Sequence, residues 1–312
     1  MTVTNLQHVG LEVPDIDKAL SFFTDVGLER VERNNHGVAR CAGRDQDQLT
    51  FIEGSQRKLH HVSFGTTESG LADITERLEG AGHALLDAPK ETPEPGIWVR
   101  DSDDVLVNVV VADAAPSLGG PGARGDQPDF LVNVPGHYHR LGPRAAPEYD
   151  TLVQPRRLGH ILQFTTDVET KIDFYTGLLG MKIADRIGPG IAFMYLDGGS
   201  DHHVVALAKS EAPGLHHASF EMGNVDEIGL NVTSMIDKGY EPTWGFGRHV
   251  VGSNYFTYFR DPWNGLVEFF SDMDYIPGDY DWQARDWPME GAFASWGPTV
   301  PDDFIINYEA VN

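Results

Sequence analysis

"KLHHVSF" at residues 58–64 and "GLHHASF" at residues 214–220 are near copies of one short stretch. Each has the apolar character of a strand, and each contains two adjacent histidines. A doubled histidine in such a strand is unusual. Its recurrence about half a chain length away indicates an internal duplication.

The repeated regions extend well beyond the histidine pairs. Residues 6–33 match residues 158–186, and residues 99–111 match residues 259–271, all in the same order along the chain. The matches place the following residues opposite one another: His8 and His160, His61 and His217, Asn108 and Glu268. Three separated matches in one order make duplication the best interpretation.

Each half has the same coarse pattern of elements. In the second half, a strand at 158–165 precedes an amphipathic helix in which Ile172, Tyr175 and Leu179 share one face. Short strands follow, then the histidine strand, a second helix near 226–238, and two strands joined by a turn. The pattern predicts an α+β protein of two tandem modules, each made of paired βαβββ units with open antiparallel sheets that enclose a site.

Changes in composition along the chain predict four segments. Residues 1–115 form an N-terminal non-catalytic module, and residues 156–275 form a C-terminal catalytic, metal-binding module. Residues 116–155, between them, are rich in Pro, Gly and Arg, which predicts a linker. The tail, residues 276–312, holds three tryptophans among Pro and Asp, so we expect it to pack on the body of the protein.

Composition limits the classes of partner. A formal net charge of -24 argues against nucleic acid and against anionic membranes. The chain has no run of about 18 apolar residues that could span a membrane, and no secretory signal is visible. Cys41 is the single cysteine, which excludes an intrachain disulfide, and we expect a cytoplasmic location.

The second half carries a candidate metal site. His160, His217 and Glu268 each lie in a strand-like segment, and the duplication relates these segments to one another. Two neutral imidazoles and one carboxylate leave open positions on a divalent ion, which is the ligand set of non-haem Fe(II) oxygenases. Zinc can use the same set. A single histidine in a strand is more often a hydrogen-bonded core residue, but the trio favours a metal site.

The first half lacks the third member of this set. Asn108 stands where the carboxylate should be, and a neutral amide is a weak ligand for a divalent transition metal. We therefore expect His8 and His61 to be hydrogen-bonded core residues and the chain to hold one metal ion.

Other side chains near these ligands suit a phenolic substrate. His203, His249 and Tyr258 could be a surface histidine, a turn histidine and a sheet tyrosine, but around a metal they would supply acid–base groups and hydrogen-bond donors. Trp244 and Phe246 lie shortly before His249 in the sequence. They either line an apolar pocket for a substituted ring or pack in the core.

These motifs resemble those of the type I extradiol catechol dioxygenases, in the vicinal oxygen chelate superfamily. "GRHVVGSNYFTYFRDPWNGLVEFF" is similar to the family fingerprint, and "LGHILQFTTDVETKIDFYTGLLGM", "DHHVVALA" and "GLHHASFE" match the other motifs in the same order. The resemblance covers nearly the whole chain and implies a vicinal oxygen chelate, or glyoxalase-like, fold. The chain departs from the fingerprint at Thr257, where the family has an apolar residue, and at Gly265, one position later than usual.

The resemblance implies roles for the site residues. It assigns Fe(II), or Mn(II) in its place, to the two histidines and the carboxylate. It assigns acid–base chemistry facing dioxygen to His203, and contact with the catechol to His249 and Tyr258. The second histidine of each pair is the family's functional one. Because adjacent strand residues face opposite sides, we expect His202 and His216 to point away from the site.

The implied activity is meta-cleavage of an alkyl- or aryl-substituted catechol by O₂, giving a muconic semialdehyde in aromatic compound degradation, by a homo-oligomer. Two other functions of the superfamily stay open. Lyases and isomerases resembling glyoxalase I usually take metal ligands from both halves and would need a carboxylate at Asn108. Metal-free small-molecule-binding modules, such as antibiotic-resistance proteins, would not need His203, Tyr258 and Glu268 together.

Overall fold

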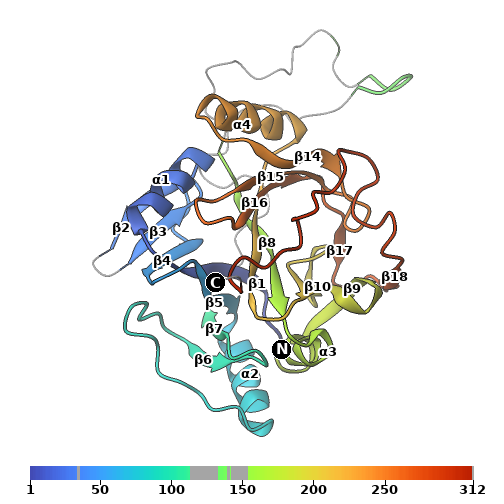
Figure 1. Cartoon of the computed structure of the whole chain (residues 1–312). Coiled ribbons are helices and arrows are strands. Elements are labelled where there is room, and N and C mark those ends of the chain that lie inside the picture. The colour runs from blue at the N-terminus through green and yellow to red at the C-terminus, as the bar shows by residue number, and fades with distance from the viewer. Residues whose placement is uncertain (34–35, 113–132, 139–140, 142–153, 311–312) are drawn as a thin grey trace.

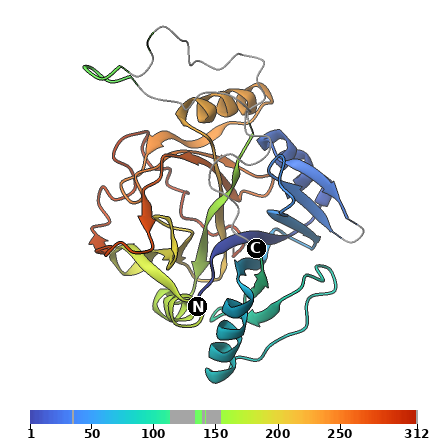
Figure 2. The same cartoon turned by 180° about the vertical axis from the view of Figure 1, so that it is seen from behind.

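The computed structural model describes residues 1–33, 36–112, 133–138, 141 and 154–310, and in it the two halves lie side by side (Figure 1). Most of the predicted linker, 116–155, falls outside the described residues. Strands β1 and β8, the first strand of each half, are neighbours at the boundary, as both the front and back views show (Figure 2).

The N-terminal half forms a seven-stranded sheet in the order β2-β3-β4-β1-β5-β7-β6. Its strands are β1 (Asn5–Val13), β2 (Glu29–Glu32), β3 (Gly37–Arg40), β4 (Leu49–Glu53), β5 (Lys58–Thr66), β6 (Ile97–Arg100) and β7 (Leu106–Val111).

The C-terminal half forms a nine-stranded sheet in the order β14-β15-β16-β13-β8-β12-β10-β9-β18. Its strands are β8 (Arg157–Thr165), β9 (Met181–Ile187), β10 (Ile191–Leu196), β12 (Val205–Lys209), β13 (Gly214–Glu221), β14 (Pro242–Arg248), β15 (Tyr255–Arg260), β16 (Leu266–Ser271) and β18 (Arg285–Trp287). Strands β11 (Gly199–Asp201) and β17 (Tyr275–Pro277) form a separate pair.

The strand order confirms the duplication. The seven strands β9-β10-β12-β8-β13-β16-β15 repeat the order β2-β3-β4-β1-β5-β7-β6. The register repeats as well, because Ser63 lies opposite both His8 and Asn108, and its counterpart lies opposite His160 and Glu268. Asn108 and Glu268 are therefore structural equivalents, as the sequence match predicts.

The sheets are mixed, so the expectation of antiparallel sheets is wrong. Strand β1 runs parallel to β4 and β5 parallel to β7, and the second half repeats this with β8 and β12 and with β13 and β16. In each unit a helical crossover and a hairpin return the last strand in the direction of the first. One unit is also incomplete: where the second half has β14, the described residues of the first half show only an isolated bridge between Leu86 and Trp98.

Helices cover the outer faces of the sheets. They are α1 (Ile16–Val26), α2 (Glu68–Gly80), α3 (Val168–Asp173), which continues as a π-helix (Phe174–Leu178), and α4 (Val225–Asp237). Asp15 caps α1 by accepting a hydrogen bond from the Lys18 amide, and Gly27 ends it in the left-handed region at φ 111°. The predicted helix near 226–238 is α4. None of the described helices is long and apolar enough to cross a membrane.

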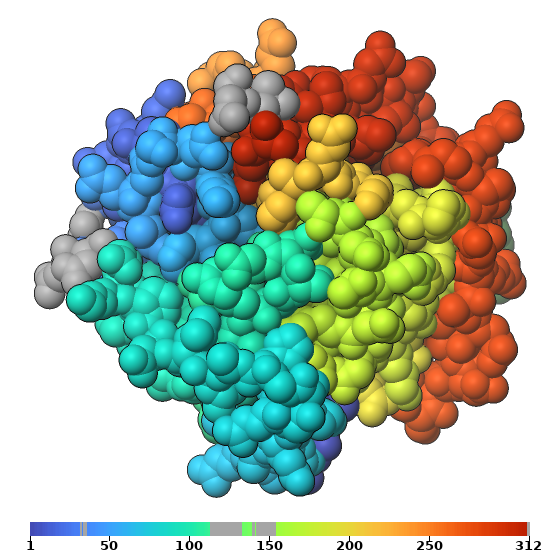
Figure 3. Space-filling view, turned by 60° about the horizontal axis from the view of Figure 1, so that its bottom comes forward, coloured from blue at the N-terminus to red at the C-terminus, as the bar shows by residue number. Residues whose placement is uncertain are grey.

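The tail lies against the C-terminal half. Strand β18 pairs with β9, and the Trp282 indole donates a hydrogen bond to the Ala184 carbonyl. In the space-filling view, the orange-red segment runs along the flank of the yellow-green strands (Figure 3). Further on, Phe304 is buried with only 6% of its surface exposed. This position brings the tail to the edge of the candidate site.

Candidate active site

Three ligand-type side chains meet on neighbouring strands of the second sheet. His160 lies on β8, His217 on β13 and Glu268 on β16. Nε2 of His160 lies 2.9 Å from Oε2 of Glu268, and Nε2 of His217 lies 3.5 Å from the same oxygen. All three side chains are buried, and one ligand atom from each lies within 4.8 Å of the others.

The chemistry of these groups fits a divalent transition metal. Nε2 of His217 is buried and has no hydrogen-bond partner in the part of the chain that the structure describes, and burial lowers the pKa of this imidazole well below its ordinary value. Burial alone would raise the pKa of Glu268, but attraction to His160 and a hydrogen bond with it lower the pKa well below its ordinary value. A neutral imidazole and an ionised carboxylate are the forms that bind metal.

Two further side chains orient the carboxylate. Ser219 Oγ donates a hydrogen bond to Glu268 Oε2 at 2.7 Å, and Asn254 Nδ2 donates one to Oε1 at 3.2 Å. Both donors are buried. Such partners fix the direction in which a ligand presents its lone pairs.

His216 does not line the pocket, although it contacts its neighbour His217. A bulge in β13 between Leu215 and His217 breaks the alternation, and the Nδ1 atoms of His216 and His217 lie 2.7 Å apart. Nε2–H of His216 donates to the Phe304 carbonyl at 2.7 Å, so its Nδ1 accepts a hydrogen bond from Nδ1–H of His217. This tautomer leaves a lone pair on Nε2 of His217, which faces the site.

His203 shows the same arrangement. Nε2 of His202 lies 3.2 Å from Asp185 Oδ2, and its Nδ1 lies 3.2 Å from Nδ1 of His203. His203 packs against the rings of His160 and Phe193. Burial and the nearby His160 lower the pKa of His203 well below its ordinary value, so the ring is neutral in the free protein. His202 itself does not line the pocket. However, both histidines lie in the segment before β12 rather than in a strand.

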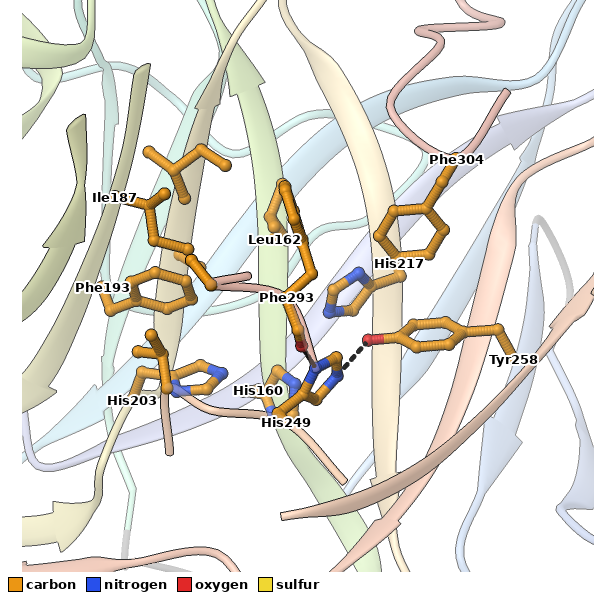
Figure 4. A pocket seen from close by; sticks show the side chains of 14 residues that line it. His160, Leu162, Ile187, Phe193, His203, His217, His249, Tyr258, Phe293 and Phe304 are labelled. Carbon is orange, nitrogen blue, oxygen red and sulfur yellow. Dashed lines mark hydrogen bonds between the residues drawn. The ribbon is translucent and has the colours of Figure 1, made fainter. Parts of the chain in front are cut away.

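His249 and Tyr258 form a hydrogen-bonded pair on the opposite side. Nδ1–H of His249 donates to the Phe293 carbonyl at 2.6 Å, so its Nε2 accepts from the Tyr258 hydroxyl at 3.1 Å (Figure 4). Burial and the charge of Glu268 raise the pKa of Tyr258 well above its ordinary value. Tyr258 therefore stays a neutral hydroxyl donor.

Comparison with known proteins identifies the family. Residues 157–269 match the family model described as the glyoxalase/bleomycin resistance protein/dioxygenase superfamily. Metapyrocatechase 2 of Cupriavidus necator is 38% identical over 309 residues, which cover 99% of this chain and 93% of that protein. The chain belongs to the extradiol dioxygenase family. The enzyme class predicted from the sequence, a catechol 2,3-dioxygenase-type oxidoreductase, is confirmed.

Relatives of this extradiol dioxygenase include both iron and manganese enzymes. An iron-dependent extradiol dioxygenase of Rhodococcus jostii is 28% identical over 95% of this chain and 97% of its own. A manganese-dependent 2,3-dihydroxybiphenyl 1,2-dioxygenase of Geobacillus genomosp. 3 is 25% identical over 91% of this chain and 90% of its own. The Mn(II)-bound glyoxalase of Novosphingobium aromaticivorans shares the fold, with a TM-score of 0.76 at 23% identity over 96% of this chain and 93% of that one.

The pocket above the ligands of this dioxygenase is mostly apolar. Histidines converge at its base, and Phe193 and Phe304 stand on opposite sides (Figure 4). Its apolar lining, among the described residues, consists of Leu162, Ile187, Ile191, Phe193, Ala206, Val251, Ala292, Phe293 and Phe304. Sequence reasoning proposed none of these nine residues, and the last three lie in the tail, which has no periodic pattern that predicts where a side chain points.

The two aromatic residues proposed from the sequence to line this pocket do not line it. Trp244 is buried behind it, stacked on Tyr258 with ring centroids 5.7 Å apart. Phe246 is 40% exposed and stacks on Tyr255, because the register of β14 shifts between Gly245 and Gly247. Trp244 therefore supports the site from behind, and Phe246 lies outside it.

The first half also differs from expectation. His8 and His61 are in hydrogen-bonding contact in the core, at 2.7 Å between their Nε2 atoms, but a carboxylate does accompany them. Oε2 of Glu94, from the loop before β6, lies 3.2 Å from Nε2 of His8. The sequence match fails to find Glu94 because this residue is not at the strand position that Asn108 occupies.

Proposed function

We propose that this protein cleaves the ring of substituted catechols next to the two hydroxyl groups, using a divalent metal held by His160, His217 and Glu268. The observation that carries this proposal is the convergence of two imidazole nitrogens and a carboxylate at the base of an apolar pocket, flanked by His203 and by the pair of His249 and Tyr258. All three ligands come from one half of the chain, whereas the alternative lyase activity would draw on both.

The metal is Fe(II), with Mn(II) as the alternative, and related enzymes named for each metal exist. When bound, it supplies positions for the two oxygens of a catecholate and the one-electron chemistry that O₂ requires. Both oxygen atoms of O₂ enter the product, so catechol and O₂ combine one to one into a muconic semialdehyde without another oxidant.

His249 and Tyr258 hold the substrate oxygen. The Nδ1–H bond to the Phe293 carbonyl fixes the His249 ring so that Nε2 is the acceptor. The hydroxyl of Tyr258, which donates to this nitrogen in the free protein, is free to turn toward a substrate oxygen. The pair can thus accept one phenolic proton and donate one hydrogen bond to the resulting anion.

His203 moves protons on the dioxygen side. Its Nδ1–H is held by His202, which in turn is held by Asp185, so the free Nε2 takes up a proton when substrate ionises. A cationic His203 then stabilises negative charge on the reacting oxygen and returns the proton as the O–O bond breaks.

The apolar walls select a substituted ring. Phe193, Phe293 and Phe304 offer rings and Ile187 and Val251 offer branched chains. The histidines and Tyr258 are the only polar side chains among the described lining residues. Such a wall favours alkyl or aryl substituents over charged ones. We also expect a homo-oligomer in the cytoplasm.

The test is a substrate panel with the metal-loaded enzyme. The protein is loaded with Fe(II) without air, mixed with catechol or with alkyl-, aryl- or carboxylate-substituted catechols, and then given O₂. We expect a yellow ring-cleavage product and one O₂ consumed per catechol, fastest with apolar substituents. Full iron occupancy without O₂ uptake on any catechol would contradict the proposed reaction. Preference for the carboxylate-substituted ring would contradict only the substrate class.

A further inference from the structure

The N-terminal half contains a second group of two histidines and one carboxylate. His8 on β1 and His61 on β5 are buried, and Glu94 reaches them from the loop that precedes β6. Ligand atoms from the three side chains lie within 4.8 Å of one another, as in the catalytic half. The side chain of Glu94 is 24% exposed, so an ion can enter from its side.

The two halves place the amide and the carboxylate in exchanged positions. In the catalytic half, Glu268 lies on the strand and Asn254 on the loop, where its amide holds the carboxylate. In the first half, Asn108 lies on the strand and Glu94 on the loop, and both pairs are separated by 14 residues. The carboxylate has therefore not been lost from the first half but stands at the loop position.

The amide of Asn108 serves to hold this loop in place. Its Nδ2 donates to the carbonyls of Pro95 and Ile97, and its Oδ1 accepts from Ser63. The indole of Trp98 donates to the carbonyl of Glu94 itself at 3.1 Å. These hydrogen bonds fix the backbone at Glu94 and just after it. The position of the Glu94 carboxylate beside His8 is therefore set by the fold.

Several buried polar side chains belong to residues next to the group in the sheet or along the chain. Oγ1 of Thr50, Oγ1 of Thr92 and Nε2 of Gln48 are buried and make no hydrogen bond among the described residues. Thr50 lies opposite Gly10 in the first sheet. The equivalent pair in the second sheet is Ala206 and Leu162, which both line the catalytic pocket. Buried polar atoms of this kind need water or an ion nearby. The residues beside this group are thus more polar than the wall of the catalytic pocket.

We propose that His8, His61 and Glu94 bind a second divalent transition-metal ion, such as Zn²⁺, with a structural role. Two imidazoles and one carboxylate, with water in the fourth position, are an established ligand set for zinc. The site has no counterpart of the catalytic tyrosine, because Trp98 stands opposite Asn108 where Tyr258 stands opposite Glu268. Bound metal would tie the loop at Glu94 to strands β1 and β5.

The experiment counts zinc in protein whose catalytic site has been removed. His217→Ala with Glu268→Gln is stripped of metal, equilibrated with Zn²⁺, desalted and measured by elemental analysis. We expect one zinc per chain. Adding Glu94→Gln should weaken Zn²⁺ binding at least about 10-fold, whereas Glu91→Gln, an exposed carboxylate of the same loop, should leave it unchanged.

The natural chain provides a second measurement if that variant does not fold. Stripped natural protein should bind two zinc ions and the single variant Glu94→Gln should bind one, with Zn²⁺ raising the unfolding temperature less in the variant. The proposal is overturned if the natural chain binds one zinc, or if Glu94→Gln binds as many as the natural chain. Neither result affects the proposed dioxygenase activity, which depends on the other half.

Discussion

The doubled histidines show how one residue sets the protonation of the next. His216 donates to a backbone carbonyl and His202 to a carboxylate, and each thereby becomes an acceptor for the Nδ1–H of its neighbour. The neighbours, His217 and His203, are left with a free Nε2 lone pair that faces the site. One lone pair is suited to a metal and the other to a proton, although the two pairs look alike in sequence.

Replacing His203 separates these two functions. His203→Phe removes the proton carrier but leaves the three ligands in place, so turnover should fall roughly 10²-fold or more while iron content stays at the natural level. Stopped-flow absorbance and elemental iron analysis on the same preparation measure both. Loss of iron in this variant would show that His203 is a ligand instead.

Replacing Glu268 should lower the metal content as well as the activity. Glu268→Gln removes the anionic ligand, so metal occupancy and activity should fall together while circular dichroism shows a folded protein. Glu211→Gln, an exposed carboxylate before β13, is the matched control and should change neither. Unchanged iron in Glu268→Gln would mean that another group supplies the carboxylate.

The sequence predicts residues on repeated strands and misses residues on loops. His160, His217 and Glu268 could be found because the duplication relates their strands and the strand register is fixed. Glu94 could not be found, because its position depends on hydrogen bonds from Asn108 that no periodicity reveals. Phe246 was misplaced for a related reason, since a register shift in β14 reverses the face on which a side chain lies.

Among the elements, the tail contributes most to the site without any sequence signal. The Phe293 carbonyl orients His249, and Phe304 packs on His216, Trp244 and Tyr258. The tryptophans of the tail predict packing on the body, but not which surface is covered. The parallel strand pairs were missed similarly, because the direction of a strand depends on the crossover that precedes it.

Truncating one tail residue should test this element. Phe304→Ala leaves a cavity beside Tyr258, which should destabilise the protein by about 3–5 kcal/mol and raise KM for apolar catechols, with iron content unchanged. The adjacent Ile305→Ala is the control, since Ile305 is 60% exposed and should cost little. Urea denaturation and steady-state kinetics measure the two effects. Equal effects of the two variants would exclude a role for the tail in the pocket.

At the scale of the whole molecule, two buried cations join the halves in a reciprocal way. Arg57 of the first half donates to Asp261 of the second at 2.7 Å, and Lys171 of the second lies 2.8 Å from Asp101 of the first. Asp101 and Asp261 occupy equivalent turns of the two halves, and each accepts hydrogen bonds from the backbone amides two and four residues further on. The turn that closes each module is therefore also where the other module is bound.

Removing one cation should loosen the pairing of the halves. In Lys171→Met, Asp101 and Asp103 lose their counter-ion inside the protein, which should cost about 3–5 kcal/mol in the free energy of unfolding. Lys182→Met is the matched control. Its lysine pairs with Asp197 at the surface with 48% of the side chain exposed, so its loss should cost less than about 1 kcal/mol.

The pH dependence of the stability lost in Lys171→Met identifies the cause of that loss. Burial opposes ionisation of Asp103, but hydrogen bonds from Thr165 and Thr166 and the charge of Lys171 lower its pKa below the ordinary value. In the natural protein this carboxylate therefore stabilises the fold above the unfolded pKa of about 4, and the contribution fades as pH falls through the folded pKa. In Lys171→Met the Asp103 carboxylate, without its counter-ion, should instead take up a proton on acidification, which restores stability. The difference in unfolding free energy between natural protein and variant should thus narrow from pH 8 to pH 5. A constant difference would mean that lost packing of the lysine stem, rather than the buried charge, accounts for it.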